Sequence, residues 1–212
     1  MVRTALDHLV VGAATLEQGE DYVEAKLGVR PSRGGKHAMM GTYNSVLRLG
    51  DRIYLEVIAV DPEAKGPGRP RWFELDRPAM QELLGASPRL IHWVARCDDI
   101  DAARRVYPVD PGPVRAASRG ALHWRITIPD DGHLPGGGVL PTLIQWADAR
   151  HPTEAMADER IRLTALAATH PTPGLIRAAL AALGLSDVLR VSYDRAPRLA
   201  AMLSTPRGPI TL

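Results

Sequence analysis

The sequence predicts an α+β protein built from two βαβββ modules, followed by a partial third unit of βαβ type. Short segments rich in β-branched and aromatic residues, such as residues 52–60 (RIYLEVIAV), alternate with segments that carry helix-capping and helix-ending residues. Two stretches also repeat: residues 6–11 (LDHLVV) match residues 90–95 (LIHWVA), and residues 54–57 (YLEV) match residues 143–146 (LIQW). Matched segments in the same order are typical of a duplicated supersecondary unit.

The first module is expected within residues 1–60. Residues 5–12 read as a buried strand, and Thr15 is a suitable cap for a helix that Gly28 would end. A loop rich in glycine and lysine follows, with room for a short strand near its start. Two strands joined by a turn at Gly50-Asp51 complete the module. The expected loop and strands are 32–40 (loop), 29–33, 41–49 and 52–60.

The second module is expected within residues 88–148, after a crossover at 61–87 whose first part is rich in proline, glycine and charge. A short helix is expected late in the crossover. The module then repeats the order strand, helix, strand, strand, strand, with Asp98 or Asp99 as the helix cap. The expected elements are 77–85 (crossover helix), 88–96, 98–106 (helix), 114–118, 121–129 and 139–147.

Residues 149–212 are expected to form the partial third module, which lacks an equivalent pair of polar strand residues. Strands are expected at 160–169 and 187–193, with an alanine-rich amphipathic helix at 174–183 between them. A short helix at 196–203 and a hairpin-like tail at 205–212 are expected to follow.

Composition limits the class of protein. The 212 residues are 45% hydrophobic and 24% charged, with a net charge of +2 and dispersed basic residues. This favours a globular chain with no nucleic-acid partner. No apolar run approaches the roughly 20 residues of a membrane helix, so we expect no membrane partner and a cytoplasmic location. Cys97 is the only cysteine, which excludes an intramolecular disulfide and a cysteine-based zinc site within one chain.

Four polar residues stand at the centres of predicted strands: His8, Glu56, His92 and Gln145. Three of them have apolar residues two positions away on both sides, so each strand would turn one polar side chain toward an apolar interior. Two imidazoles and a carboxylate suit Fe, Mn, Co, Ni or Zn as divalent ions, with Gln145 as a weak ligand or an orienting group. The alternatives are that Glu56 faces solvent and that each histidine is an ordinary core residue.

The chain resembles the vicinal-oxygen-chelate superfamily, and more narrowly the glyoxalase-like domain proteins. The resemblance rests on the duplication, on the four polar strand positions, and on three further segments: 37–44 (HAMMGTYN), 54–56 (YLE) and 205–208 (TPRG). It implies a cupped mixed sheet around a central metal that chelates substrate oxygens. Glyoxalase I enzymes of similar fold carry a glutamate base at the position of Gln145. Since a glutamine cannot accept that proton, glyoxalase I activity is not expected.

The base would then come from Glu56, His37 or His123. His37, Thr42, Asn44 and His123 are the further candidates for contact with substrate, although His37 in a loop is as consistent with an exposed residue. We expect a metal-dependent enzyme acting on a small oxygen-chelating substrate by isomerase, lyase or dioxygenase-type chemistry. The alternatives are a metal-free protein that binds or sequesters a small molecule, and a structural or regulatory dimer module. A homodimer is possible in each case.

Overall fold

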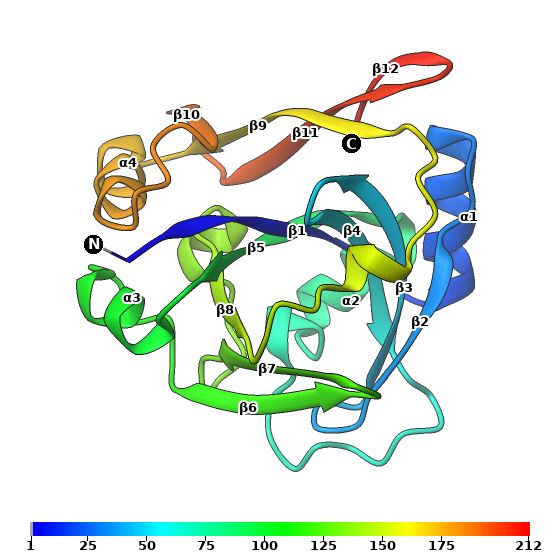
Figure 1. The fold of residues 1–212 in the computed structure, drawn as a ribbon, viewed down its shortest axis with the longest axis horizontal. Helices are drawn as coiled ribbons and strands as arrows, with labels where there is room; N and C mark the ends of the chain where they lie inside the picture. The colour runs from blue at the N-terminus through cyan, green and yellow to red at the C-terminus, as the bar shows by residue number, and fades with distance from the viewer. Residues whose placement is uncertain (1) are drawn as a thin grey trace.

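Two β-sheets form the framework of the chain in a computed structural model that describes residues 2–212 (Figure 1). The larger sheet has eight strands in the order β2-β3-β4-β1-β5-β8-β7-β6. The smaller has four, in the order β10 (Leu189–Tyr193), β9 (Arg162–His170), β11 (Arg198–Thr205) and β12 (Gly208–Thr211). The strands of the larger sheet are β1 (Thr4–Gly12), β2 (Ser32–His37), β3 (Thr42–Gly50), β4 (Ile53–Val60), β5 (Arg89–Cys97), β6 (Val114–Arg119), β7 (Leu122–Thr127) and β8 (Thr142–Trp146).

The predicted duplication is present in the larger sheet. In the first module β1 pairs with β4 in parallel, and in the second β5 pairs with β8 in parallel. Each remaining pair within a module is antiparallel, and the two modules meet where β1 runs antiparallel to β5. The end of β6 comes close to β2, so the curved sheet is nearly closed. The modules therefore pair within one chain and enclose a common interior.

Helix α1 (Leu16–Leu27) begins and ends where the sequence predicts. The Thr15 hydroxyl accepts a hydrogen bond from the backbone N–H of Gln18, and Gly28 takes the left-handed conformation (φ 76°) that ends the helix. Helix α3 (Ile100–Val106) has the same kind of start, because the Asp99 carboxylate accepts from the N–H of Ala102. Strand β2 replaces most of the loop expected at 32–40 and pairs along β3 despite its two glycines.

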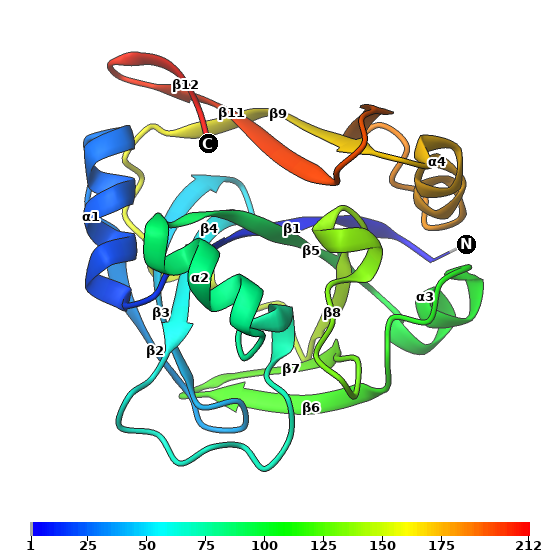
Figure 2. The ribbon, with the colours of Figure 1, turned by 180° about the vertical axis from the view of Figure 1, so that it is seen from behind.

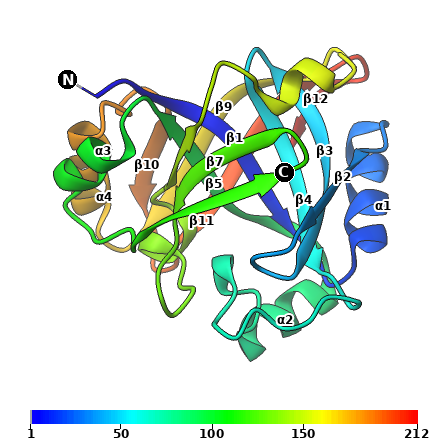
Figure 3. The ribbon, with the colours of Figure 1, turned by 60° about the horizontal axis from the view of Figure 1, so that its bottom comes forward.

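Two apolar cores lie on opposite faces of the larger sheet. Leu9 and Trp93 belong to the outer core, whereas their neighbours Val10 and Val94 belong to the inner one. This alternation sends the side chains of His8 and Glu56 toward the inner face, as strand periodicity predicts. The crossover covers one end of the interior with the 3-10 helix η1 (Trp72–Glu74) and helix α2 (Pro78–Ala86) (Figure 3).

The smaller sheet packs over the outer core, on the side of β1 and β5 (Figure 2). Strand β9, helix α4 and strand β10 form the expected parallel βαβ unit, and β11 with β12 extends the sheet. The prediction of a helix at 196–203 is wrong. Although this segment is rich in alanine, it forms a strand that pairs with β9 and buries every second residue, Ala201 and Leu203. The elements are β9 (Arg162–His170), α4 (Pro173–Ala182), β10 (Leu189–Tyr193), β11 (Arg198–Thr205) and β12 (Gly208–Thr211).

No helix in residues 2–212 combines the length and apolar character needed to cross a membrane.

Candidate active site

A small pocket opens inside the larger sheet, between the two modules. The space between its lining atoms, with open solvent at the mouth included, measures about 380 Å³, so the enclosed part is much smaller. The first module supplies mostly polar groups, and the second module and the crossover supply mostly aromatic ones. The lining residues are His8, His37, Asn44, Tyr54, Glu56, Trp72, Phe73, Arg119, Trp124, Ile126, Ile144 and Trp146.

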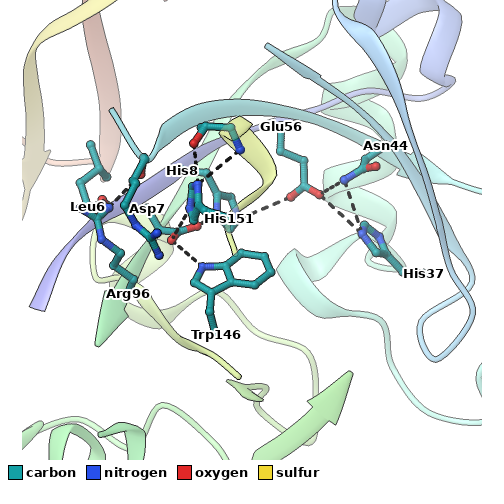
Figure 4. Close-up of polar contacts among 11 residues, drawn as sticks. Leu6, Asp7, His8, His37, Asn44, Glu56, Arg96, Trp146 and His151 are labelled. Atoms are coloured by element: carbon teal, nitrogen blue, oxygen red, sulfur yellow. Dashed lines mark hydrogen bonds and ion pairs between the residues drawn. The ribbon is translucent and has the colours of Figure 1, made fainter. Parts of the chain in front are cut away.

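A β-bulge in β1 explains how two consecutive residues, Asp7 and His8, both reach this site. The pairing of β1 with β5 shifts register between Leu6 and His8. The Arg96 guanidinium donates hydrogen bonds to the carbonyl oxygens of Leu6 and Arg52, which keeps the bulged backbone satisfied (Figure 4). The bulge therefore adds a carboxylate beside the predicted histidine.

Asp7 is fully buried and accepts three hydrogen bonds. The donors are His8 Nδ1 at 2.7 Å, Trp146 Nε1 at 2.9 Å and His151 Nε2 at 3.2 Å (Figure 4). Burial alone would raise the pKa of Asp7, but the hydrogen bonds from His151 and His8 outweigh it and hold this pKa well below its ordinary value. Asp7 is thus an anion that holds the proton of His8 on Nδ1, and the Nε2 lone pair of His8 is left facing the pocket.

Glu56 lies opposite His8 on β4 and is 5% exposed. Its Oε1 accepts a hydrogen bond of 2.5 Å from the side-chain amide of Asn44. Its Oε2 lies 3.7 Å from His8 Nε2, and Oε1 lies 3.8 Å from His37 Nε2. Glu56 therefore has one oxygen held by Asn44 and one directed at His8, without a hydrogen bond to it.

His37 is a neutral imidazole at the edge of this group. Its Nδ1 lies 3.1 Å from the Thr42 hydroxyl, and its Nε2 lies 3.4 Å from the Asn44 amide nitrogen. Burial lowers the pKa of His37 to about 4, which outweighs the opposing effect of the Glu56 carboxylate. Because Asn44 donates, Nε2 of His37 accepts and Nδ1 carries the proton. Thr42 is buried and contacts His37 but does not line the pocket.

His92 is fully buried near the pocket without lining it. Its Nε2 lies 2.9 Å from the Thr142 hydroxyl and accepts from the Thr142 backbone N–H at 3.2 Å. Its Nδ1 donates to the Gly138 carbonyl oxygen at 3.1 Å, and Phe73 packs against the ring. Burial lowers the pKa of His92 to about 3. Both ring nitrogens are therefore occupied by hydrogen bonds, which is the core role considered as the alternative for this histidine.

Gln145 and His123 point away from the pocket. On β8, Ile144 and Trp146 line the pocket, so the side chain of Gln145 between them lies on the opposite face. There its amide oxygen accepts from the Ile100 backbone N–H, and its amide nitrogen donates to the Asp98 carbonyl oxygen, both at 3.0 Å. His123 is exposed on β7, beside Trp124, which takes the inward position.

The four residues predicted as metal ligands are consequently not brought together. His8 and Glu56 face each other, but the nitrogens of His92 are engaged elsewhere and Gln145 supports helix α3. Across residues 2–212, no group of three or more His, Cys, Asp or Glu side chains is arranged to hold a metal ion. The donor set present does not fit the divalent metal that the resemblance implies.

Asp7 and His151 carry no clear signal in the sequence, and the position of Arg119 depends on the near closure of the sheet. Asp7 is hidden by the bulge, and His151, in loop-like sequence, reaches the site only because the connection after β8 returns to β1. Arg119 stands at the end of β6 and donates to the Asn44 amide oxygen at 2.7 Å across the gap between the modules. The aromatic walls give no specific signal either, because large apolar side chains serve equally well in a protein core.

A family model described as a glyoxalase-like domain matches residues 6–184, most of the chain. The chain belongs to this family. The resemblance inferred from the duplication and the strand residues is therefore confirmed.

Similarity to solved structures agrees at the level of the fold. A hypothetical protein from Staphylococcus aureus matches with a TM-score of 0.66 and 12% identity, covering 92% of this chain and 88% of that one. Methylmalonyl-CoA epimerases match less well. The Mycobacterium tuberculosis enzyme has a TM-score of 0.42 and 20% identity over 68% of this chain and 88% of its own. A variant of the Streptomyces coelicolor enzyme has a TM-score of 0.43 and 17% identity over 70% of this chain and 98% of its own. No curated protein matches the chain.

Proposed function

We propose that this glyoxalase-like protein is an enzyme that transfers a proton on a small oxygen-bearing substrate, with Glu56 and His8 as the acid–base pair. The observation that carries the proposal is the 3.7 Å separation between Glu56 Oε2 and His8 Nε2, which face each other in the pocket. Neither atom forms a hydrogen bond to another group within residues 2–212. Two proton acceptors left free in an enclosed site are available to a substrate.

The supporting residues fix the roles of this pair. Asp7 holds the Nδ1 proton of His8, so His8 can accept or donate a proton only at Nε2. Asn44 occupies Oε1 of Glu56, so the carboxylate presents Oε2. An arrangement in which an aspartate orients a histidine base is a known solution to acid–base catalysis. Among the described residues, no hydroxyl or thiol nucleophile is in hydrogen-bond contact with His8 Nε2, which favours proton transfer over acyl transfer.

The reaction that suits this arrangement is the removal of a proton from a carbon beside a carbonyl group. Glu56 Oε2 takes the proton while the electron pair of the C–H bond moves onto the carbonyl oxygen. The protonated Glu56 then returns this proton to the carbon, or passes it to His8 Nε2, which gives it to that oxygen. Return of a proton gives an isomer or epimer, and loss of a leaving group gives a lyase product. The aromatic walls lower the polarity around the intermediate.

The test is proton exchange in heavy water. A panel of small 2-oxo and 3-oxo acids is incubated with the protein in D2O, and loss of the proton beside the carbonyl is followed by NMR. We expect exchange of at least one compound by the wild type and loss of about 100-fold or more in Glu56→Gln. Glu63→Gln is the matched control, because Glu63 is an exposed carboxylate that pairs with Lys36.

Retention of the exchange rate in Glu56→Gln would refute the acid–base role. A second candidate, a metal-free protein that sequesters a small molecule, is favoured by the five aromatic side chains in the lining. It predicts that compounds bind without exchange, and that Glu56→Gln and the wild type do not differ in turnover.

A further inference from the structure

The Arg119 guanidinium is a cation in the pocket wall without a carboxylate partner. Its only side-chain hydrogen bond is the one to the Asn44 amide oxygen, and within residues 2–212 no carboxylate oxygen lies within 4.0 Å of it. The side chain is half-buried and reaches from β6 to β2. A partly buried guanidinium whose hydrogen-bond acceptor is only an amide oxygen is expected to bind an anion from solution.

The neighbouring arginines do not share this property. An adjoining groove is lined by Arg33, Arg119 and Arg150, among others. Arg33 forms ion pairs with Glu17 and Glu20, and Arg150 forms one with Asp148. Arg119 is thus the uncompensated cation where the groove and the pocket meet, since it lines both.

The backbone opposite Arg119 leaves room for its side chain to lie flat. A Cβ atom at Gly34 would lie 3.1 Å from Arg119 Nη1, and one at Gly35 would lie 2.9 Å from Arg119 Cδ. Gly35 also has a positive φ (150°), and β2 shifts register against β3 at this point. The glycine pair therefore provides the space in which the guanidinium spans the gap between the modules.

A second unpartnered donor lines the same pocket. The Nε1–H of Trp72 is buried and has no hydrogen-bond acceptor among the described residues. Buried N–H groups in proteins are normally paired, so an acceptor from outside the chain is expected here. The pocket thus has a cationic donor at Arg119 beside aromatic walls, and one of its wall residues, Trp72, carries a buried N–H without an acceptor among the described residues.

We propose that the substrate of this pocket is a small organic acid whose carboxylate is bound by Arg119, with Trp72 Nε1–H donating to an oxygen of the same molecule. The planar guanidinium suits a carboxylate in a bidentate arrangement, and the walls of Phe73, Trp124 and Trp146 suit an apolar body. This assignment rests on the proposed function, because it takes the pocket as the functional site. It makes Arg119 the residue that selects acids over neutral analogues.

The test compares phenylacetate with phenylacetamide, which have the same shape and differ in charge. Each is titrated into the protein while the tryptophan Nε1–H signals are followed by two-dimensional NMR, with the Trp72 signal assigned from Trp72→Phe. We expect the wild type to prefer phenylacetate by about tenfold or more, with the Trp72 signal shifted. We expect Arg119→Gln to lose the preference while still binding the amide, and Arg119→Lys to retain part of it.

Arg104→Gln is the control for removing one positive charge, because Arg104 pairs with Asp110 on the surface of α3. It should leave the preference unchanged. Equal binding of acid and amide by the wild type, or a preference that persists in Arg119→Gln, would overturn the assignment. Glu56→Gln separates the two proposals: it should bind phenylacetate at least as well as the wild type, whether or not it has lost proton exchange.

Discussion

Replacing Asp7 with asparagine tests the centre of the site. The carboxylate of Asp7 is fully buried and accepts from two histidines and a tryptophan. An asparagine keeps one acceptor oxygen but turns an N–H group toward one or two of these donors. Hydrogen bonds to a charged group contribute about 1.5–3 kcal/mol each, and the lower cost of burying a neutral side chain offsets part of the loss. We expect Asp7→Asn to lower the free energy of unfolding by about 2–4 kcal/mol.

The measurement is urea unfolding at several pH values, checked by calorimetry. For a chain of this size the expected loss corresponds to a fall in Tm of about 4–16 °C. The pKa of Asp7 is depressed in the folded protein, so its contribution is present above the ordinary aspartate pKa of about 4 and is lost as pH falls below it. The difference between variant and wild type should therefore shrink below about pH 4. A difference under about 0.5 kcal/mol at pH 7 would refute the idea that Asp7 is a hydrogen-bonded anion.

Three further outcomes are expected. Burial lowers the pKa of the His37 imidazole to about 4, so NMR should show no titration of this ring between pH 5.5 and 8. Protonation of His37 should destabilise the fold increasingly as the pH falls from about 6.5 toward 4. A titration midpoint near pH 6.5 would contradict the buried, neutral state of His37. His92→Ala should lower the free energy of unfolding by about 2–4 kcal/mol, because the hydrogen bonds of the buried ring are lost. The metal content measured by plasma mass spectrometry should stay unchanged. Loss of a stoichiometric metal in the variant would identify His92 as a ligand after all. Gly138→Ala should lower the free energy of unfolding in urea by more than about 2 kcal/mol, because Gly138 has a φ of 93° and the added Cβ would lie 2.3 Å from the Ile91 carbonyl oxygen. An unchanged urea midpoint would show that this turn can relax.

The sequence predicted the fold well because the fold repeats. Strand periodicity placed His8 and Glu56 on one face, and both line the pocket. The same argument failed for Gln145 because its neighbours Ile144 and Trp146 hold the inward positions. A strand alternates every residue, so aligning two repeats by similarity alone leaves an uncertainty of one position, which reverses the face.

Other parts of the site depend on features that a sequence does not display. Asp7 reaches the site through a β-bulge, and Arg119 through the near closure of the sheet. His92 has the sequence position of a ligand, but the turn that places Gly138 against it decides its role. The helix predicted at 196–203 failed because pairing with β9 overrides the preference of alanine for helix.

The two halves of the duplicated sheet have divided the chemistry between them. The reactive groups stand on strands of the first half, namely Asp7, His8, Asn44 and Glu56. The second half presents Trp124 and Trp146, with one cation at its far edge. Each half on its own therefore lacks part of the site. Mutations at positions of the second half that form no hydrogen bond with the first half can change which molecules fit while the proton-handling groups opposite remain intact. At such positions the fold allows specificity to vary independently of reactivity.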